Sequence, residues 1–105
     1  MEYAAPLHFA ATSGKPDAEA FIMMEHLLEL GVDINGMDEV QGPYGRGTPL
    51  HYAAISGRVE RVRFLLEHGA DPHMTHFGWK PIDEARKYWK SDVVKFLKDR
   101  ERSRL

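Results

Sequence analysis

Three of the six histidines lie close together in the sequence, and this arrangement could support metal chemistry. His68 is followed by His73-Met-Thr-His76, and neutral imidazole nitrogens are common zinc ligands. A zinc ion held by His68, His73 and His76 could activate a water molecule for hydrolysis or deamination. The segment from His73 to His76 contains no carboxylate and falls in a predicted loop. We therefore expect no metal site, and a metal-dependent enzyme is the remote alternative.

No other arrangement typical of catalysis is present. The sequence has no cysteine, which excludes disulfides, thiolate metal sites and cysteine nucleophiles. It has neither a nucleophile elbow nor a helical HExxH pair. The glycine-rich stretch Gly42-Pro-Tyr-Gly-Arg-Gly47 lacks the lysine of a phosphate-binding loop. We expect no catalytic residue and no cofactor, and therefore no enzyme.

The composition predicts one small globular domain. The 105 residues are 43% hydrophobic and 29% charged, and no apolar run is long enough to span a bilayer. The first residues do not resemble a secretory signal, so we expect an intracellular protein, in the cytoplasm, with the nucleus as the alternative. The formal charge of −2 is uneven, since residues 1–45 carry −7 and residues 46–105 carry +5. The basic C-terminal residues alternate with Asp99 and Glu101, which favours a solvated helix, and we expect neither a membrane nor a nucleic acid as partner.

A repeated motif organises the chain, and such repeats are typical of solenoid proteins. Two motif segments recur, one rich in alanine and one that ends in Gly-x-Asp. The alanine-rich copies are Ala5-Pro-Leu-His-Phe-Ala-Ala11, Thr48-Pro-Leu-His-Tyr-Ala-Ala54 and the weaker Lys80-Pro-Ile-Asp-Glu-Ala85, and the other copies are Leu27-Leu-Glu-Leu-Gly-Val-Asp33 and Leu65-Leu-Glu-His-Gly-Ala-Asp71. The first copy is longer than the second because of insertions near 15–20 and 39–45.

Each copy predicts a short helix, a turn, a second helix and a loop. Proline suits the first turn of a helix, and Thr48 is a suitable N-cap residue. Asp17 and Ser91 are the candidate caps of two second helices. Each second helix carries one apolar stripe with helical spacing. The stripes are Phe21, Met24, Leu27 and Leu28; Val59, Val62, Leu65 and Leu66; and Val93, Val94, Phe96 and Leu97. A single helix pair cannot bury such a stripe, whereas stacked pairs can.

The second copy resembles an ankyrin repeat. The resemblance rests on Thr48-Pro-Leu-His-Tyr-Ala-Ala-Ile-Ser-Gly57, followed by an apolar stripe and Gly69-Ala-Asp71. It implies one all-α domain over 1–105, an ankyrin-repeat solenoid of stacked antiparallel helix pairs joined by hairpin-like loops. The expected repeats are about 5–37, 48–78 and a degenerate 79–103, with a long loop at 38–47. The structural motif residues are Pro6, His8, Gly14, Gly31, Thr48, Pro49, His51, Gly57, Gly69 and Pro81, and His8 and His51 are expected to tie neighbouring turns together.

The resemblance implies non-catalytic protein–protein binding through the loop tips, called fingers, and the exposed face of the first helices. Carried over by position, the partner-binding residues are Thr12, Met37, Tyr44, Arg46, Tyr52, Ile55, Ser56, His76, Phe77, Trp79, Lys87 and Tyr88. Among the loop aromatics, Trp79 is expected to be the buried one and Tyr44 the better partner anchor. Asn35 resembles a finger asparagine that is hydroxylated in some family members, but we expect an ordinary turn asparagine.

The two ends of the repeat array depart from the family pattern. Ala5 replaces the usual threonine of the first cap. Arg86 replaces a packing alanine and Trp89 replaces a glycine, so we expect nothing to stack beyond the third repeat. The N-terminal face of the first repeat has no evident cap, and the acidic segment Asp17–Leu30 is the one candidate for that role. A partner protein is therefore the first hypothesis. The alternative is a short self-associating array in which the acidic N-terminal end meets the basic C-terminal region, and we expect a monomer or weak self-association.

Overall fold

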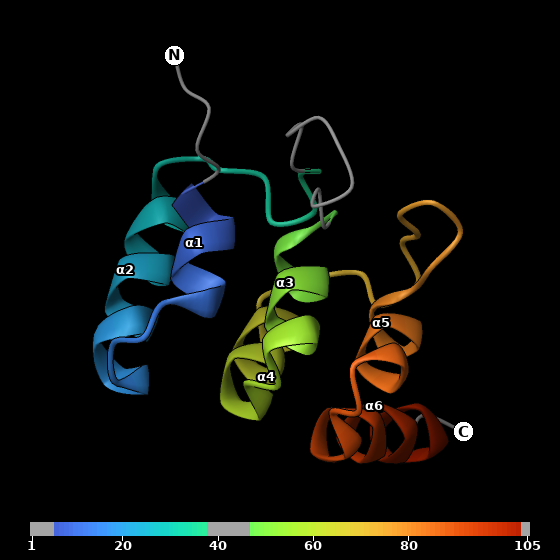
Figure 1. Cartoon of the computed structure of the whole chain (residues 1–105). Helices are drawn as coiled ribbons and strands as arrows, with labels where there is room; N and C mark the ends of the chain where they lie inside the picture. The colour runs from blue at the N-terminus through green and yellow to red at the C-terminus, as the bar shows by residue number, and fades with distance from the viewer. Residues whose placement is uncertain (1–5, 38–46, 104–105) are drawn as a thin grey trace.

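The computed structural model describes residues 6–37 and 47–103, and these two ranges contain six helices. The helices are α1 (Pro6–Thr12), α2 (Asp17–Glu29), α3 (Pro49–Ser56), α4 (Val59–Glu67), α5 (Pro81–Lys87) and α6 (Ser91–Ser103). They form three helix pairs that stand side by side in chain order, and in this view α6 lies across the lower end of α5 (Figure 1). The all-α fold of stacked helix pairs is thus confirmed.

The motif around Thr48 explains where the first helices begin and end. Thr48 caps α3 because its Oγ1 accepts a hydrogen bond from the backbone N–H of His51 at 3.3 Å, and Pro49 follows as the first helical residue. Gly57 ends the helix in the left-handed conformation, with φ +75°. In the third pair Asp83 takes the place of His51, and its carboxylate accepts a bond from the N–H of Lys80. Ala5, at the first of these caps, lies outside the described residues.

A continuous apolar core runs through the stack. The first helices pack on one another in the order α1, α3, α5, and each second helix packs behind its own first helix. The core combines the predicted stripes of the second helices with apolar residues of the first helices. It includes the fully buried Leu50 of α3 and Val62, Leu65 and Val93 of the stripes. Fully burying one such side chain contributes roughly 1.5–3 kcal/mol, so the shared core accounts for why the pairs stack.

A buried cation joins the first and second pairs. The guanidinium of Arg61 in α4 is completely buried and donates hydrogen bonds to the carbonyl oxygens of Ala10, Ser13 and Lys15. Its Nε also donates to Asp17 Oδ1 at 2.9 Å. The prediction that Asp17 caps α2 is wrong, because its carboxylate is engaged by Arg61 and makes no cap hydrogen bond.

The turn between α5 and α6 places a large side chain where the second pair has a glycine. Trp89 adopts φ +63°, close to the φ +75° of Gly57 at the corresponding position. The left-handed region costs a residue with a Cβ roughly 1–2 kcal/mol. Burial of the indole within the described chain does not offset that cost, because 90% of Trp89 is exposed.

Candidate functional site

The second finger, the loop between α4 and α5, is the best-defined candidate for a binding surface. His76 and Trp79 form a two-residue hairpin, since each backbone N–H donates to the carbonyl oxygen of the other at 2.9 and 3.0 Å. Phe77 and Gly78 at its tip both have positive φ, +53° and +82°, which is the backbone of a type I′ turn. The hairpin therefore has a defined shape.

His51 fixes this hairpin to the helix stack. Its ring is fully buried, and Nδ1 accepts from the backbone N–H of Thr48 at 3.2 Å and lies 2.8 Å from Thr48 Oγ1. Because Nδ1 accepts, Nε2 carries the proton and donates to the carbonyl oxygen of Trp79 at 2.8 Å. One neutral imidazole thus holds the start of α3 and the base of the second finger together.

His8 makes the corresponding link one pair earlier. Its Nε2 lies 2.8 Å from the carbonyl oxygen of Gly36 and 3.0 Å from that of Gly47, so it can donate to the two ends of the first finger. The fingers are also joined to each other, because the N–H of Asp71 donates to Oδ1 of Asn35 at 2.9 Å. The amide of Asn35 therefore has a structural partner.

Burial lowers the pKa of His51, and the neighbouring rings of His76 and His8 act in the same direction, while the bond to Trp79 partly opposes them. Below about pH 6.5 the unfolded chain binds a proton at this histidine more readily than the folded chain does. The free energy of unfolding should therefore fall as the pH is lowered from about 7 to 5.5. Urea titrations across this range check this, and the decline should be weaker in His51→Gln. His26→Gln, a variant of an exposed histidine, should keep the decline of the unsubstituted chain.

Aromatic side chains surround the hairpin on its outer side. Phe77 at the tip is 82% exposed, and its ring lies 4.4 Å from that of His76. The prediction that Trp79 is buried is wrong, because 40% of it is exposed. The backbone of Trp79, and not its indole, makes the link to His51, and the indole lies outside beneath the ammonium of Lys87 at 5.1 Å. Lys87 also lies over the ring of Tyr88 at 5.6 Å.

The other predicted partner-binding residues have mixed placements. Tyr52 lies edge-on to the ring of His8 at 5.0 Å and is half-buried. Thr12, Ile55 and Ser56 are also half-buried on the first helices, and Met37 is exposed. Tyr44 and Arg46, and the loop around them, lie outside the described residues. The structure therefore brings His76, Phe77, Trp79, Lys87 and Tyr88 together. Thr12, Ile55 and Ser56 lie in the last turns of α1 and α3.

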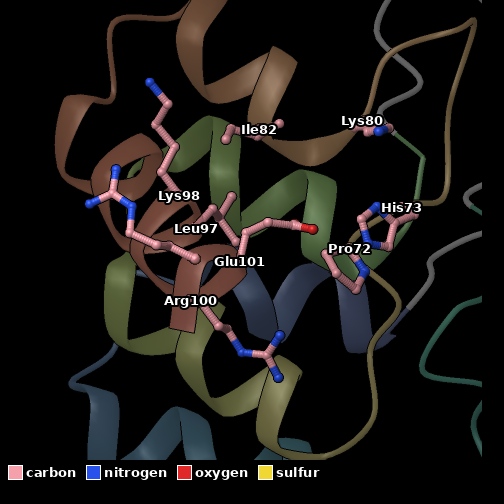
Figure 2. Close-up of a pocket in the computed structure, with 9 residues that line it drawn as sticks. Pro72, His73, Lys80, Ile82, Leu97, Lys98, Arg100 and Glu101 are labelled. Atoms are coloured by element: carbon pink, nitrogen blue, oxygen red, sulfur yellow. The ribbon is translucent and has the colours of Figure 1, made fainter. Parts of the chain in front are cut away.

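A basic pocket of about 360 Å³ lies between the second finger and α6, and the sequence interpretation did not anticipate it. Pro72, Ile82 and Leu97 give it apolar walls, and four cationic side chains line it. Figure 2 shows Lys98 and Arg100 pointing away from each other, while Glu101 reaches across toward the finger. Its charges therefore do not converge on one point as they would in a dedicated anion site.

The three histidines of the metal hypothesis do not form one cluster, and His68 and His76 make separate contacts. His68 stacks on Phe64 with ring centroids 4.0 Å apart, and its Nδ1 lies 2.8 Å from the carbonyl oxygen of Phe64. His76 belongs to the hairpin and faces His51. Among residues 6–37 and 47–103, no three His, Asp or Glu side chains are grouped closely enough to hold a metal ion.

Comparison with known families agrees with this architecture. A family model described as "Ankyrin repeats (3 copies)" matches residues 7–103. The chain belongs to the ankyrin-repeat family. Ankyrin repeats are generally protein–protein interaction modules and are typically non-catalytic. Within the part of the chain that the structure describes, no helix has the length and apolar character needed to cross a membrane.

Several characterised proteins contain a similar segment. The chain is 46% identical over 52 residues to the mouse 2-5A-dependent ribonuclease, and the matched segment covers 50% of this chain and 6% of the ribonuclease. It is 42% identical over 69 residues to the human DNA-binding protein RFXANK, covering 65% and 23%. It is 34% identical over 92 residues to human transient receptor potential cation channel subfamily A member 1, covering 87% and 8%. The ankyrin segment thus spans less than a quarter of each of these relatives.

Proposed function

We propose that this ankyrin-repeat chain is a non-catalytic binding module that captures a partner protein on the second finger and the adjoining face of the first helices. The observation that carries the proposal is Phe77, a large apolar side chain held in the open at the tip of a fixed hairpin. The repeats that build this surface are proposed to span about 5–37, 48–78 and 79–103.

The chemistry of the surface supports protein recognition. Phe77 and Trp79 present two rings on the hairpin. Tyr88 at the end of α5 adds a third ring, which shares the ammonium of Lys87 with Trp79. Aromatic residues are enriched at protein interfaces, and tyrosine and tryptophan at their hot spots. Lys87 lies over two of these rings, so the surface combines apolar area with a cation that suits a carboxylate or a carbonyl group of a partner. Because His51 holds the base of the hairpin, little conformational entropy remains to be lost when a partner binds.

The proposal predicts that the ring of Phe77 is needed for partner capture and not for folding. Phe77→Asn removes the ring while keeping a residue that tolerates positive φ and suits a type I′ turn. Combined with Trp79→Ala, it should reduce retention of the partner from lysate of the source cells by at least about tenfold, since hot-spot truncations commonly cost about 2 kcal/mol or more. Quantitative mass spectrometry of the retained proteins measures this.

Leu30→Ser is the matched control. Leu30 is also a large exposed apolar residue, but it is the C-cap residue of α2, at the far end of the stack from α5. Its variant should retain the same proteins as the unsubstituted chain. If the double variant retains the partner unchanged while circular dichroism shows native helix content, the assigned surface is wrong.

A further inference from the structure

The end of the stack formed by α5 and α6 carries a basic groove that the proposed function does not use. The groove has a volume of about 550 Å³, and Trp89 and Val94 form its apolar part. Its cationic side chains are those of Arg86, Lys90, Lys95, Lys98 and Arg102. Among the described residues that line it, Asp99 is the one carboxylate, and it is paired with Lys95. Trp89 is the most exposed large apolar residue in the described chain.

This end does not accept a fourth repeat in the way the first three repeats stack. Ala11 and Ala54 hold equivalent positions in α1 and α3, and both are fully buried. Arg86 holds this position in α5 and is exposed. The guanidinium lies 3.6 Å from the carboxylate of Asp83 on its own helix, in a solvent-exposed pair. A closely packed repeat would remove this charged pair from water, and the desolvation penalty would disfavour the contact. A surface that brings a carboxylate to Arg86 avoids this cost.

The opposite end of the stack is apolar and exposed. In the second pair, Tyr52 and Arg61 cover the first pair, with Tyr52 against His8 and Arg61 bonded to Ala10. The repeat register places Phe9 and Met23 at the corresponding positions of the first pair. Both are exposed, Phe9 to 62%, and the neighbouring Ile22 is exposed as well.

The two ends also carry opposite charge. Residues 6–37 contain five acidic side chains and Lys15 as the single base. Residues 80–103 contain eight bases and five acids. Glu19 precedes Ile22 by three residues and Met23 by four, so it shares their side of α2. The acidic end thus offers apolar side chains beside carboxylates, which is the chemistry that the groove around Trp89 requires.

We propose that copies of this chain associate end to end, with the α1–α2 end of one copy seated on the Trp89 groove of the next. In this contact Phe9, Ile22 and Met23 cover the indole. The carboxylates of Glu19 and Glu29 in α2 approach Arg86 and Lys90. The contact joins two different surfaces, so it continues from copy to copy unless its rotation closes a ring. Its ionic part weakens as salt screens the charges. This inference does not depend on the partner surface around Phe77.

Sedimentation of the full chain over a range of concentrations, at low and at high salt, tests the proposal. The average mass should rise with concentration at low salt and less at high salt. Trp89→Gly should weaken the association at least about tenfold, because it removes a central aromatic anchor. Glycine suits the φ of +63° at this position, so the melting temperature of this variant should be unchanged or higher. Phe77→Asn, which also removes an exposed aromatic ring at positive φ, should associate like the unsubstituted chain.

A charge exchange identifies the two surfaces. The variant Arg86→Glu/Lys90→Glu should be monomeric alone, and so should Glu19→Lys/Glu29→Lys. Mixing the two should restore a complex, because the reversed ends are complementary again. A chain that stays monomeric at low salt and high concentration overturns the proposal. It is also overturned if Trp89→Gly and Phe77→Asn associate equally, or if the mixed charge variants stay apart.

Discussion

Replacing Arg61 with leucine is expected to lower the free energy of unfolding by about 3 kcal/mol, through the loss of charge-assisted hydrogen bonds to three carbonyl oxygens. Those oxygens belong to Ala10, Ser13 and Lys15, at the end of α1 and in the turn that follows it. Leucine can replace part of the apolar stem of Arg61 but can donate to none of them. For a domain whose total stability is about 5–10 kcal/mol, this is a large fraction.

Urea unfolding followed by circular dichroism measures this loss. The variants Arg61→Lys and Asp17→Asn separate the contribution of the carbonyl hydrogen bonds from that of the ion pair. Lysine keeps the charge but cannot make the fork of hydrogen bonds, so it should lose most of the stability that leucine loses. The asparagine side chain would keep an oxygen for the Nε–H of Arg61, and the side chain of Asp17 is 47% exposed. That variant should therefore cost less than about 1 kcal/mol. A greater loss in Asp17→Asn than in Arg61→Leu would show that the ion pair, and not the carbonyl contacts, holds the two pairs together.

The second large effect is expected for Gly47→Ala, which should destabilise the chain by about 3 kcal/mol. Gly47 has φ +88°, and a Cβ at this position would lie 2.9 Å from Cβ of His76 and 3.0 Å from Nδ1 of His51. The neighbouring atoms belong to the fixed base of the second finger, so they cannot move without disturbing the hydrogen bonds of His51. Backbone strain and crowding therefore act together.

Gly69→Ala separates these two causes. Gly69 also has positive φ, +97°, but apart from its immediate chain neighbours no atom lies within 4 Å of the place that a Cβ would take. Its substitution should therefore cost about 1 kcal/mol, from backbone strain alone. Equal losses in the two variants, measured by the same urea titrations, would show that crowding against His51 contributes nothing.

The stacked helix pairs could be predicted because each relevant signal is local and repeated. The proline and threonine that begin a first helix, the glycines that end it and the apolar stripe of the second helix act within a few residues of one another. Gly57 and Leu65 take the conformation and burial that their motif positions indicate. These features depend on the backbone preferences of single residues and on the spacing of apolar residues, and both can be read from one sequence.

The candidate surface was harder to predict, because it depends on contacts between distant residues. Trp79 was expected to be buried, but its backbone carbonyl is held by a histidine 28 residues away, which leaves the indole outside. Asp17 was expected to cap its own helix, yet it is engaged by Arg61, 44 residues away. Arg61 itself looks like part of a polar helix face in the sequence. Nothing local indicates that carbonyl groups from another pair surround it.

The stacking order gives the middle pair a role that its neighbours do not share. The main helix contacts run from α1 to α3 and from α3 to α5, and likewise from α2 to α4 and from α4 to α6. Energetic coupling in such an array passes between adjacent units only. A disturbance in α3 or α4 therefore isolates the two outer units from each other, whereas a disturbance at either end remains local. Within residues 6–37 and 47–103, the middle unit therefore connects the two ends, and occupancy of one end influences the other through it. It is also the unit whose sequence lies closest to the family motif.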